Sequence, residues 1–205
     1  MSESRALLAP GELREPPFAR FLFADTRASI LWLIVRLYVG YQWIEAGLSK
    51  VGNPAWTGDH AGAAITGFAK GALAKTNGDH PDVQGWYGTL LTDVVIPNAK
   101  TFSYLVAIGE TAVGIALVLG VLTGIAAFFG VLMNANYLLA GTVSSNPILI
   151  ILGALLMLAW RNAGWIGLDR FILPALGTPW QPGVAWRRDV EDRDDGYRGR
   201  PTAEG

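Results

Sequence analysis

Two ionisable side chains stand inside apolar stretches, and they are the residues of this chain best placed to do chemistry. Arg36 interrupts the run ASILWLIVRLYVGYQWIEAG, and Glu110 interrupts the apolar run that follows residue 102. A charge surrounded by lipid is costly and is kept where it is paired or functional. A guanidinium can donate to an oxyanion or a carbonyl, and a desolvated carboxylate can take up and release a proton. We therefore predict Arg36 and Glu110 as catalytic residues.

Helical spacing indicates how the two residues could meet. Arg36 shares one helical stripe with four other residues, in steps of four, three, four and three: Gly40, Trp43, Gly47 and Lys50. Glu110 has a comparable stripe on its own helix, and small residues on both stripes allow close approach of two backbones. Counted at about 1.5 Å per residue from the ends of the apolar runs, both charges lie at similar depth. We expect Arg36 and Glu110 to face each other across a bundle interior.

Three further residues are candidates for holding a cofactor. Asn134 lies at about the depth of Glu110, whereas Asn136, two residues on, points to a different face. Trp43 shares the Arg36 stripe and offers a ring that can stack on a quinone. Glu45 lies about 180° from Arg36 and is either a second proton group or a solvated carboxylate at the membrane boundary.

A purely structural interpretation uses the same atoms. An Arg36 to Glu110 salt bridge could fix helix register without any chemistry, and an asparagine could join two helices. We expect Lys50 to snorkel outward to water, and the alternative is a role in attracting anions.

Four apolar segments must position these residues, and we predict them as transmembrane helices at about 28–47, 102–120, 122–142 and 145–161. Some twenty residues at about 1.5 Å each cover the roughly 30 Å hydrocarbon layer. Charges elsewhere are confined to the ends and to the long connection, as expected where lipid is the solvent. The predicted fold is all-α, an integral membrane four-helix bundle over residues 28–176.

The positions of the cations predict the orientation. Arginines flank the spans in the N-terminal arm, 1–27, and after residue 160, while the four lysines lie between residues 50 and 100, in the connection at about 50–99 or directly after it. By the positive-inside rule we expect both termini in the cytoplasm and a multi-pass protein of the plasma membrane. The connection is then external, and its stretches GAAITGFAKGALAK and GWYGTLLTDVVIP are predicted as amphipathic helices on the bilayer or capping the bundle. We predict a polar, disordered cytoplasmic tail at 177–205.

Composition removes several classes of function. The net charge of −1, without a basic stretch carrying interleaved aromatics, argues against nucleic acid as a partner. The absence of cysteine excludes disulfides, thiolate metal sites and a dithiol relay. His60 and His80 have no partners at metal-ligand spacing, so no metal is expected. Redox chemistry would need a quinone, a haem or another subunit.

Three motifs in order resemble the DoxX/DoxD family of four-helix membrane proteins. They are R-x3-G-x2-W-x3-G-x2-K from Arg36, E-x3-G-x2-L-x2-G from Glu110, and G-L-D-R ending at Arg170. The resemblance covers about residues 28–176. It implies a quinone-linked redox system like that of the DoxD membrane subunit of thiosulfate:quinone oxidoreductase, which oxidises thiosulfate to tetrathionate with a second redox subunit, DoxA.

Two main hypotheses of function remain after this comparison. The first is a membrane subunit of a quinone-linked oxidoreductase that uses thiosulfate, with a DoxA-like partner; whether the chain itself catalyses the reaction stays open. The second is a non-catalytic membrane anchor or assembly protein for a soluble redox partner. A small transporter is the weaker third, because the spans lack the broken helices of transport sites.

Overall fold

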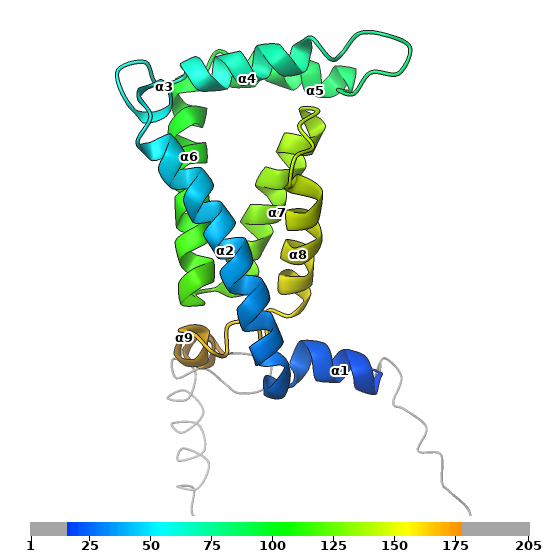
Figure 1. The fold of residues 1–205 in the computed structure, drawn as a ribbon, viewed down its shortest axis with the longest axis vertical. Coiled ribbons are helices and arrows are strands. Elements are labelled where there is room, and N and C mark those ends of the chain that lie inside the picture. The colour runs from blue at the N-terminus through cyan, green and yellow to red at the C-terminus, as the bar shows by residue number, and fades with distance from the viewer. Residues whose placement is uncertain (1–15, 178–205) are drawn as a thin grey trace, which may run out of the picture.

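The computed structural model describes residues 16–177, and in this part of the chain the secondary structure is helical, without strands. Four helices run along the long axis of the molecule: α2 (Ser29–Val51), α6 (Ala99–Leu119), α7 (Thr123–Leu139) and α8 (Asn146–Leu158) (Figure 1). Each of the four segments predicted as spans overlaps one of them over most of its length, although α2 runs four residues past the predicted end and α6 begins three residues before the predicted start. The prediction of an all-helical fold is confirmed.

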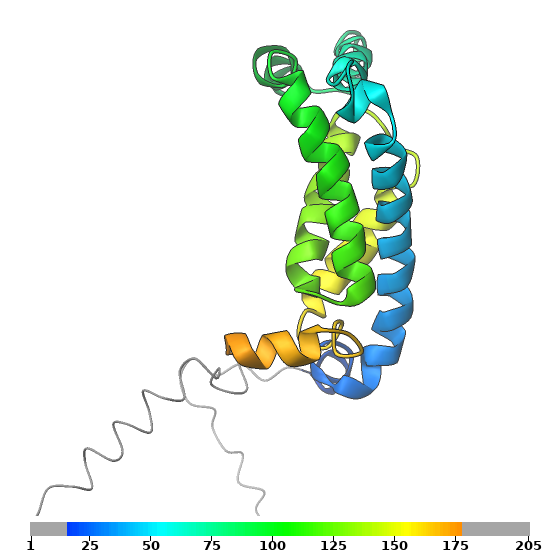
Figure 2. The ribbon, with the colours of Figure 1, turned by 90° about the vertical axis from the view of Figure 1, so that its left-hand side faces the viewer.

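Short helices lie across both ends of these four, as Figures 1 and 2 show. One end, called the cap below, consists of α3 (Pro54–Thr57), α4 (Ala63–Leu73), α5 (Gly85–Leu90) and a π-helical turn at Leu91–Val95. The opposite end, called the base, consists of α1 (Pro17–Ala24), a 3-10 turn at Thr26–Ala28, the loop 159–168 and α9 (Asp169–Leu176). The predicted tail 177–205 lies outside the described residues, apart from Gly177.

The cap is the segment predicted to connect the first two spans. Both stretches predicted as helices form them, the first as α4 and the second as α5 with the π-helical turn. They pack on the end of α7 through a small apolar core that includes Ala69, Tyr87 and Ala140. The Tyr87 hydroxyl donates to the backbone oxygen of Asn136 at 3.1 Å, and burial raises the pKa of this hydroxyl. The cap is thus fixed to the bundle.

The four long helices differ in length and in how apolar they are. Among the described residues, α6 is the helix that is both long and apolar enough to cross a membrane. Helices α7 and α8 are apolar but shorter, at 17 and 13 residues. Helix α2 is longer, with 23 residues, and carries Arg36, Glu45 and Lys50.

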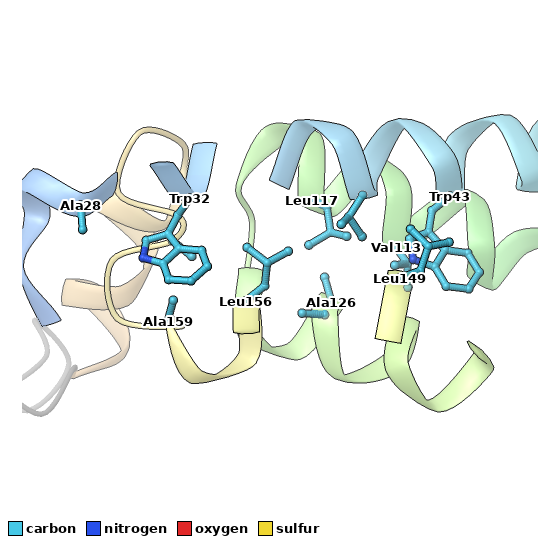
Figure 3. Packing of buried hydrophobic residues seen from close by; sticks show 12 residues of the cluster. Ala28, Trp32, Trp43, Val113, Leu117, Ala126, Leu149, Leu156 and Ala159 are labelled. Atoms are coloured by element: carbon cyan, nitrogen blue, oxygen red, sulfur yellow. The ribbon is translucent and has the colours of Figure 1, made fainter. Parts of the chain in front are cut away.

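Small residues bring α2 and α6 into close antiparallel contact, as their stripes predicted. A methyl group on Gly47 would lie 2.4 Å from the Thr111 hydroxyl, and one on Gly114 would lie 2.5 Å from the Ile44 backbone nitrogen. Larger side chains fill the space toward α7 and α8, among them Trp32, Trp43, Leu117 and Leu156 (Figure 3). Close backbone contact at these glycines therefore fixes the register of α2 against α6.

The base is held by side chains that bind backbone groups. The Asp169 carboxylate accepts hydrogen bonds from the Leu122 and Thr123 amides, at 2.5 and 2.9 Å, and so caps the start of α7. Leu122 has a left-handed φ of 45°, which a non-glycine residue adopts only when its surroundings hold it there. The Asn162 amide donates to the Leu22 and Asp25 carbonyls, and the Trp32 indole donates to Leu22 as well.

The hydrogen bonds that Asp169 accepts at the start of α7 predict that loss of its carboxylate destabilises the fold strongly. Asp169→Ala leaves two buried N–H groups without their charged acceptor, so it should lower the free energy of unfolding by about 2–4 kcal/mol. Denaturant unfolding in detergent, followed by circular dichroism, measures this. Arg170→Ala, at the exposed neighbouring position, is the control and should change stability little; equal effects of the two would contradict the assignment.

Candidate functional site

Glu110 lies in the middle of α6 with 1% of its surface exposed, and two side chains bind its carboxylate. The Lys50 ammonium on α2 donates to Oε2 at 2.6 Å. The Tyr137 hydroxyl on α7 donates to Oε1. Three helices thus converge on one buried carboxylate, and both of its oxygens accept a hydrogen bond. Such charge-assisted bonds are about twice as strong as neutral ones.

Lys50 joins this carboxylate to the cap. The side chain of Lys50 is 18% exposed, near the end of α2. Its ammonium also donates to the Ala46 carbonyl at 3.3 Å and lies 5.2 Å from the centre of the Trp56 ring on α3. A cation over an indole face is attracted by the ring electrons. The Lys50 side chain is therefore partly exposed on the side of the cap, and the Glu110 carboxylate compensates its charge inside the bundle.

Tyr137 is covered by the cap in the same way. The Phe68 ring of α4 meets the Tyr137 ring edge to face, with 5.9 Å between centroids. Because α3 covers Lys50 and α4 covers Tyr137, the carboxylate lies directly beneath the cap. The long helices thus provide the polar side chains of the site, and the cap covers them.

Unsatisfied polar groups lie beside this cluster. Asn134 is about one turn from Tyr137 on α7 and 1% exposed, and within residues 16–177 neither of its amide atoms has a hydrogen-bond partner. The same holds for the buried hydroxyl of Ser103, two turns from Glu110 on α6. A buried donor or acceptor without a partner costs about 1–3 kcal/mol. Each of these groups retains the capacity to bind a water or a polar ligand.

Trp43 borders the same region. It is 3% exposed, and a methyl group on Gly130 would lie 3.0 Å from its indole nitrogen. Gly130 lies one turn from Asn134 on α7, so Trp43 and Asn134 occupy adjacent turns of one interior face. Of the predicted site residues, Glu110, Trp43 and Asn134 are thus brought together.

The predicted pairing of Arg36 with Glu110 is wrong. Arg36 is buried at the base, where its Nη2 donates to the Ile166 carbonyl at 2.6 Å and the Asp169 carboxylate interacts with it electrostatically. A methyl group on Gly120 would lie 1.5 Å from Arg36 Nη1, so the guanidinium lies level with the end of α6. Glu110 is ten residues away on that helix, about 15 Å along its axis.

Glu45 lies apart from the site as well. Its side chain is exposed on the outer surface of α2 and takes no part in the Glu110 cluster. Asn136 is also exposed; its amide donates to the Leu132 carbonyl, and its oxygen accepts from the Tyr87 hydroxyl at 3.3 Å. Asn136 therefore anchors the cap rather than facing the interior, in agreement with its predicted face.

A comparison with known protein families adds an independent observation. The family model of DoxX matches residues 31–142, which is more than half of the 205-residue chain. The chain belongs to the DoxX family. This membership makes it a membrane protein of the DoxX type. No curated protein and no solved structure gives a significant match to the chain.

The matched range of this DoxX protein contains the whole Glu110 cluster. It begins in α2 and ends just after α7, so it includes Lys50, Glu110, Asn134 and Tyr137. Helix α8 and the base residue Asp169 lie outside it. The buried carboxylate and its partners therefore belong to the part of the chain that matches the family model.

Sequence reasoning missed the two direct partners of Glu110 in this DoxX protein. Lys50 was predicted to snorkel outward, although it lies on the same stripe as Trp43 and Gly47. Tyr137 was not among the predicted site residues, although it follows Asn134 by three residues and so shares its face. A lysine and a tyrosine on the inner faces of adjacent helices were the available signal.

The described residues hold no group of three or more His, Cys, Asp or Glu side chains arranged to bind a metal ion. The cluster in this DoxX protein is instead one carboxylate, one ammonium and one phenol. These groups can position a proton and a polar ligand, which is general acid and base chemistry.

The charges of Lys50 and Glu110 should contribute to stability as a coupled pair. Lys50→Met and Glu110→Gln each break a mostly buried pair and should lower the free energy of unfolding by about 2–4 kcal/mol, while the double variant should lose less than the sum. Denaturant unfolding in detergent gives the coupling energy. Lys100→Met, at an exposed lysine on α6, is the matched control. Strict additivity of the two changes would show that the pair is not coupled.

Proposed function

We propose that this DoxX protein is a four-span membrane subunit of a quinone-linked oxidoreductase, and that the Glu110 cluster handles protons at its quinone site. The observation that carries the proposal is a buried carboxylate, bound by Lys50 and Tyr137, with the unpartnered amide of Asn134 about one turn from Tyr137. A purely structural ion pair would not require an unsatisfied amide next to it.

The surface of the long helices supports placement of all four in the membrane. Large apolar side chains are exposed on each of them, among them Ile34 (64%), Ile108 (58%), Phe129 (50%) and Ile151 (61%). Soluble proteins rarely expose contiguous apolar surface on this scale. Polar groups of the same helices, such as Glu110 and Asn134, face inward instead. We infer that lipid surrounds the bundle, with the cap on the external side and both termini on the cytoplasmic side.

The unsatisfied groups fit a quinone. Asn134 offers an amide N–H to a quinone carbonyl, Ser103 offers a hydroxyl, and Trp43 offers an aromatic face. When bound, a quinone supplies an acceptor for two electrons and two protons. Asn134 would bind and orient this group, and the surrounding apolar side chains would exclude water from it.

The Glu110 cluster can then hold and move the proton. The Tyr137 hydroxyl and the Lys50 ammonium both donate to the Glu110 carboxylate, so a proton taken from either group stays within one hydrogen-bonded set. Lys50 is the member of the set that is partly exposed, on the cap side. We infer that protons reach Glu110 through Lys50 from the external face.

We propose thiosulfate as the electron donor to be tested, because the chain resembles DoxD in its motifs and in its long external segment. Two thiosulfate ions release two electrons when they join as tetrathionate, which matches the capacity of one quinone. A second redox subunit of the DoxA type, docked on the cap side, would complete the enzyme.

The proposed topology can be tested directly, because the chain contains no cysteine. Asn77→Cys places a thiol in the cap, and Ala175→Cys places one on α9. A membrane-impermeant maleimide should label the first in intact cells and the second only after permeabilisation, while Ile108→Cys on the outer face of α6 should resist labelling in both. Four spans place the cap and α9 on opposite sides of the membrane. Labelling of both thiols from outside would place them on the same side and would contradict the four-span topology.

Quinone reduction tests the chemistry. In membranes that contain the protein and its partners, thiosulfate should reduce a short-chain ubiquinone analogue, followed by absorbance. Glu110→Gln and Tyr137→Phe should each lower the rate by about 10²-fold or more, as expected for loss of a positioned acid or base. Asn134→Leu should chiefly raise the apparent KM for the quinone.

Glu45→Gln is the control for a carboxylate on the outer face of α2 and should retain the rate. Arg36→Lys tests the predicted catalytic role of Arg36, and from its position at the base we expect it to affect stability rather than the pH profile. An unchanged rate in Glu110→Gln would contradict the proposal. A protein that captures a redox partner but neither binds quinone nor turns over would be an anchor or assembly protein instead.

A further inference from the structure

The outer face of α2 carries a carboxylate that the proposed redox function does not use. Large apolar side chains lie on the same face, including Ile34 at 64% exposure and Leu48 at 55%. Glu45 is exposed between them, and within residues 16–177 its carboxylate forms no hydrogen bond or ion pair. Ionisable side chains in membrane spans almost always face the interior of a bundle, so Glu45 departs from the usual arrangement.

The contacts between α2 and α6 give the depth of Glu45. Gly47 packs against Thr111, which lies eight residues before the base end of α6. Glu45 is two residues nearer the base than Gly47, so it is level with a point about 9 Å from that end of α6 and about 21 Å from the other end. Snorkelling is a property of the long lysine and arginine side chains. The shorter glutamate side chain does not reach water from this depth.

Glu45 belongs to a polar stripe on the outer face of α2, called the outer seam below. Four residues follow one another along it in steps of four, three and four: Tyr38, Gln42, Glu45 and Ser49. Residues with this spacing share one side of a helix, and the same spacing forms the seam along which two helices pack as a left-handed pair. Polar side chains on such a seam join membrane helices by hydrogen bonds.

None of the described helices covers the outer seam. Helices α6 and α8 both contact α2. Along the bundle, α2 lies at the front in Figure 1 and at the right-hand edge in Figure 2, and its outer side is free of other helices in both views. Water would satisfy such a face in a soluble protein, but lipid tails offer no hydrogen bonds. The seam therefore requires a polar partner from outside the chain.

The donors and acceptors of the outer seam complement a second copy of the same seam. The Gln42 amide donates one N–H to the Tyr38 hydroxyl at 3.2 Å and has a second N–H to offer. The Glu45 carboxyl group is an acceptor one step further along. Two copies in one membrane have the same orientation, so their α2 helices run parallel. A two-fold axis along the membrane normal then places Gln42 of each copy near Glu45 of the other.

We propose that a second copy of this chain covers the outer seam of α2, and that the Glu45 carboxyl group of each copy accepts a hydrogen bond from the Gln42 amide of the other. The inference rests on the membrane placement proposed above, but not on quinone chemistry. The Glu110 cluster lies on the opposite face of α2, so each copy contains its own complete candidate site. A donor and an acceptor on one seam favour an identical partner over a different protein.

Disulfide cross-linking in membranes tests the proposal, because the chain contains no cysteine. Ser49→Cys places a thiol on the outer seam with little change in side-chain size. Oxidation with copper phenanthroline should join two copies and give a band of twice the mass on a non-reducing gel. Ala112→Cys is the matched control, since Ala112 is a small exposed residue at similar depth on α6. This variant should remain a single chain.

Substitution of Glu45 tests the role of its carboxyl group. Glu45→Leu makes the seam apolar without touching the bundle interior, and native mass spectrometry in detergent gives the association constant of the cysteine-free chain. This variant should lower the constant about tenfold, because two symmetry-related interhelical hydrogen bonds are lost. Glu45→Gln keeps an acceptor on the seam and should preserve the dimer. Thermal unfolding in detergent verifies that both variants are folded.

Equal cross-linking of Ser49→Cys and Ala112→Cys would overturn the proposal, because it would reflect random collision. An unchanged association constant in Glu45→Leu would overturn it as well. A cross-linked product that contains another protein, identified by mass spectrometry, would show that a different subunit covers the seam. None of these measurements records quinone reduction. Loss of quinone reduction with an intact dimer would therefore refute only the redox function, and loss of the dimer with intact quinone reduction would refute only this interface.

Discussion

A single buried carboxylate sets the arrangement of the rest of this molecule. Glu110 is 1% exposed in an apolar bundle, where a charge without partners would strongly destabilise the fold. Its two partners come from the end of α2 and the far half of α7, so both helices must be in register with the middle of α6. The glycine contacts at Gly47 and Gly114 fix one of these registers at backbone distance. The cap then covers the exposed sides of Lys50 and Tyr137 with Trp56 and Phe68.

Arg36 forms the centre of a second polar layer at the other end of the same helices. Its guanidinium fits against Gly120 and Gly167, where side chains would collide with it, and bonds to a backbone carbonyl rather than to an acid. Asp169 stands nearby and caps α7. The two layers differ in kind: the base layer binds backbone groups and closes the fold, while the layer beneath the cap joins side chains of three helices through one buried carboxylate.

The sequence predicted the helices and their inner faces but not the pairing of charges. Apolar runs of about twenty residues are a strong signal, and the stripes on α2 and α6 do face each other. The depth of Arg36 was counted from the start of an apolar run, which assumed that the start of α2 is level with the end of α6. In the structure Arg36 lies level with Gly120, so the first two turns of α2 extend past the end of α6 into the base. Lys50, fourteen residues further along α2, is then the residue opposite Glu110. Such an offset depends on tertiary packing and is invisible to hydropathy.

The cap on α7 that Asp169 provides has a consequence for the order of assembly. The turn between α6 and α7 precedes its acceptor by nearly fifty residues, and all of α8 lies between them. During synthesis, the hairpin of α6 and α7 is therefore complete before the carboxylate that closes it exists. Until then Asp169 cannot support the left-handed conformation that Leu122 has in the complete fold. The base therefore cannot close in this way before Asp169 has been synthesised, and a nascent chain that has reached only α8 still lacks the acceptor for the first amides of α7.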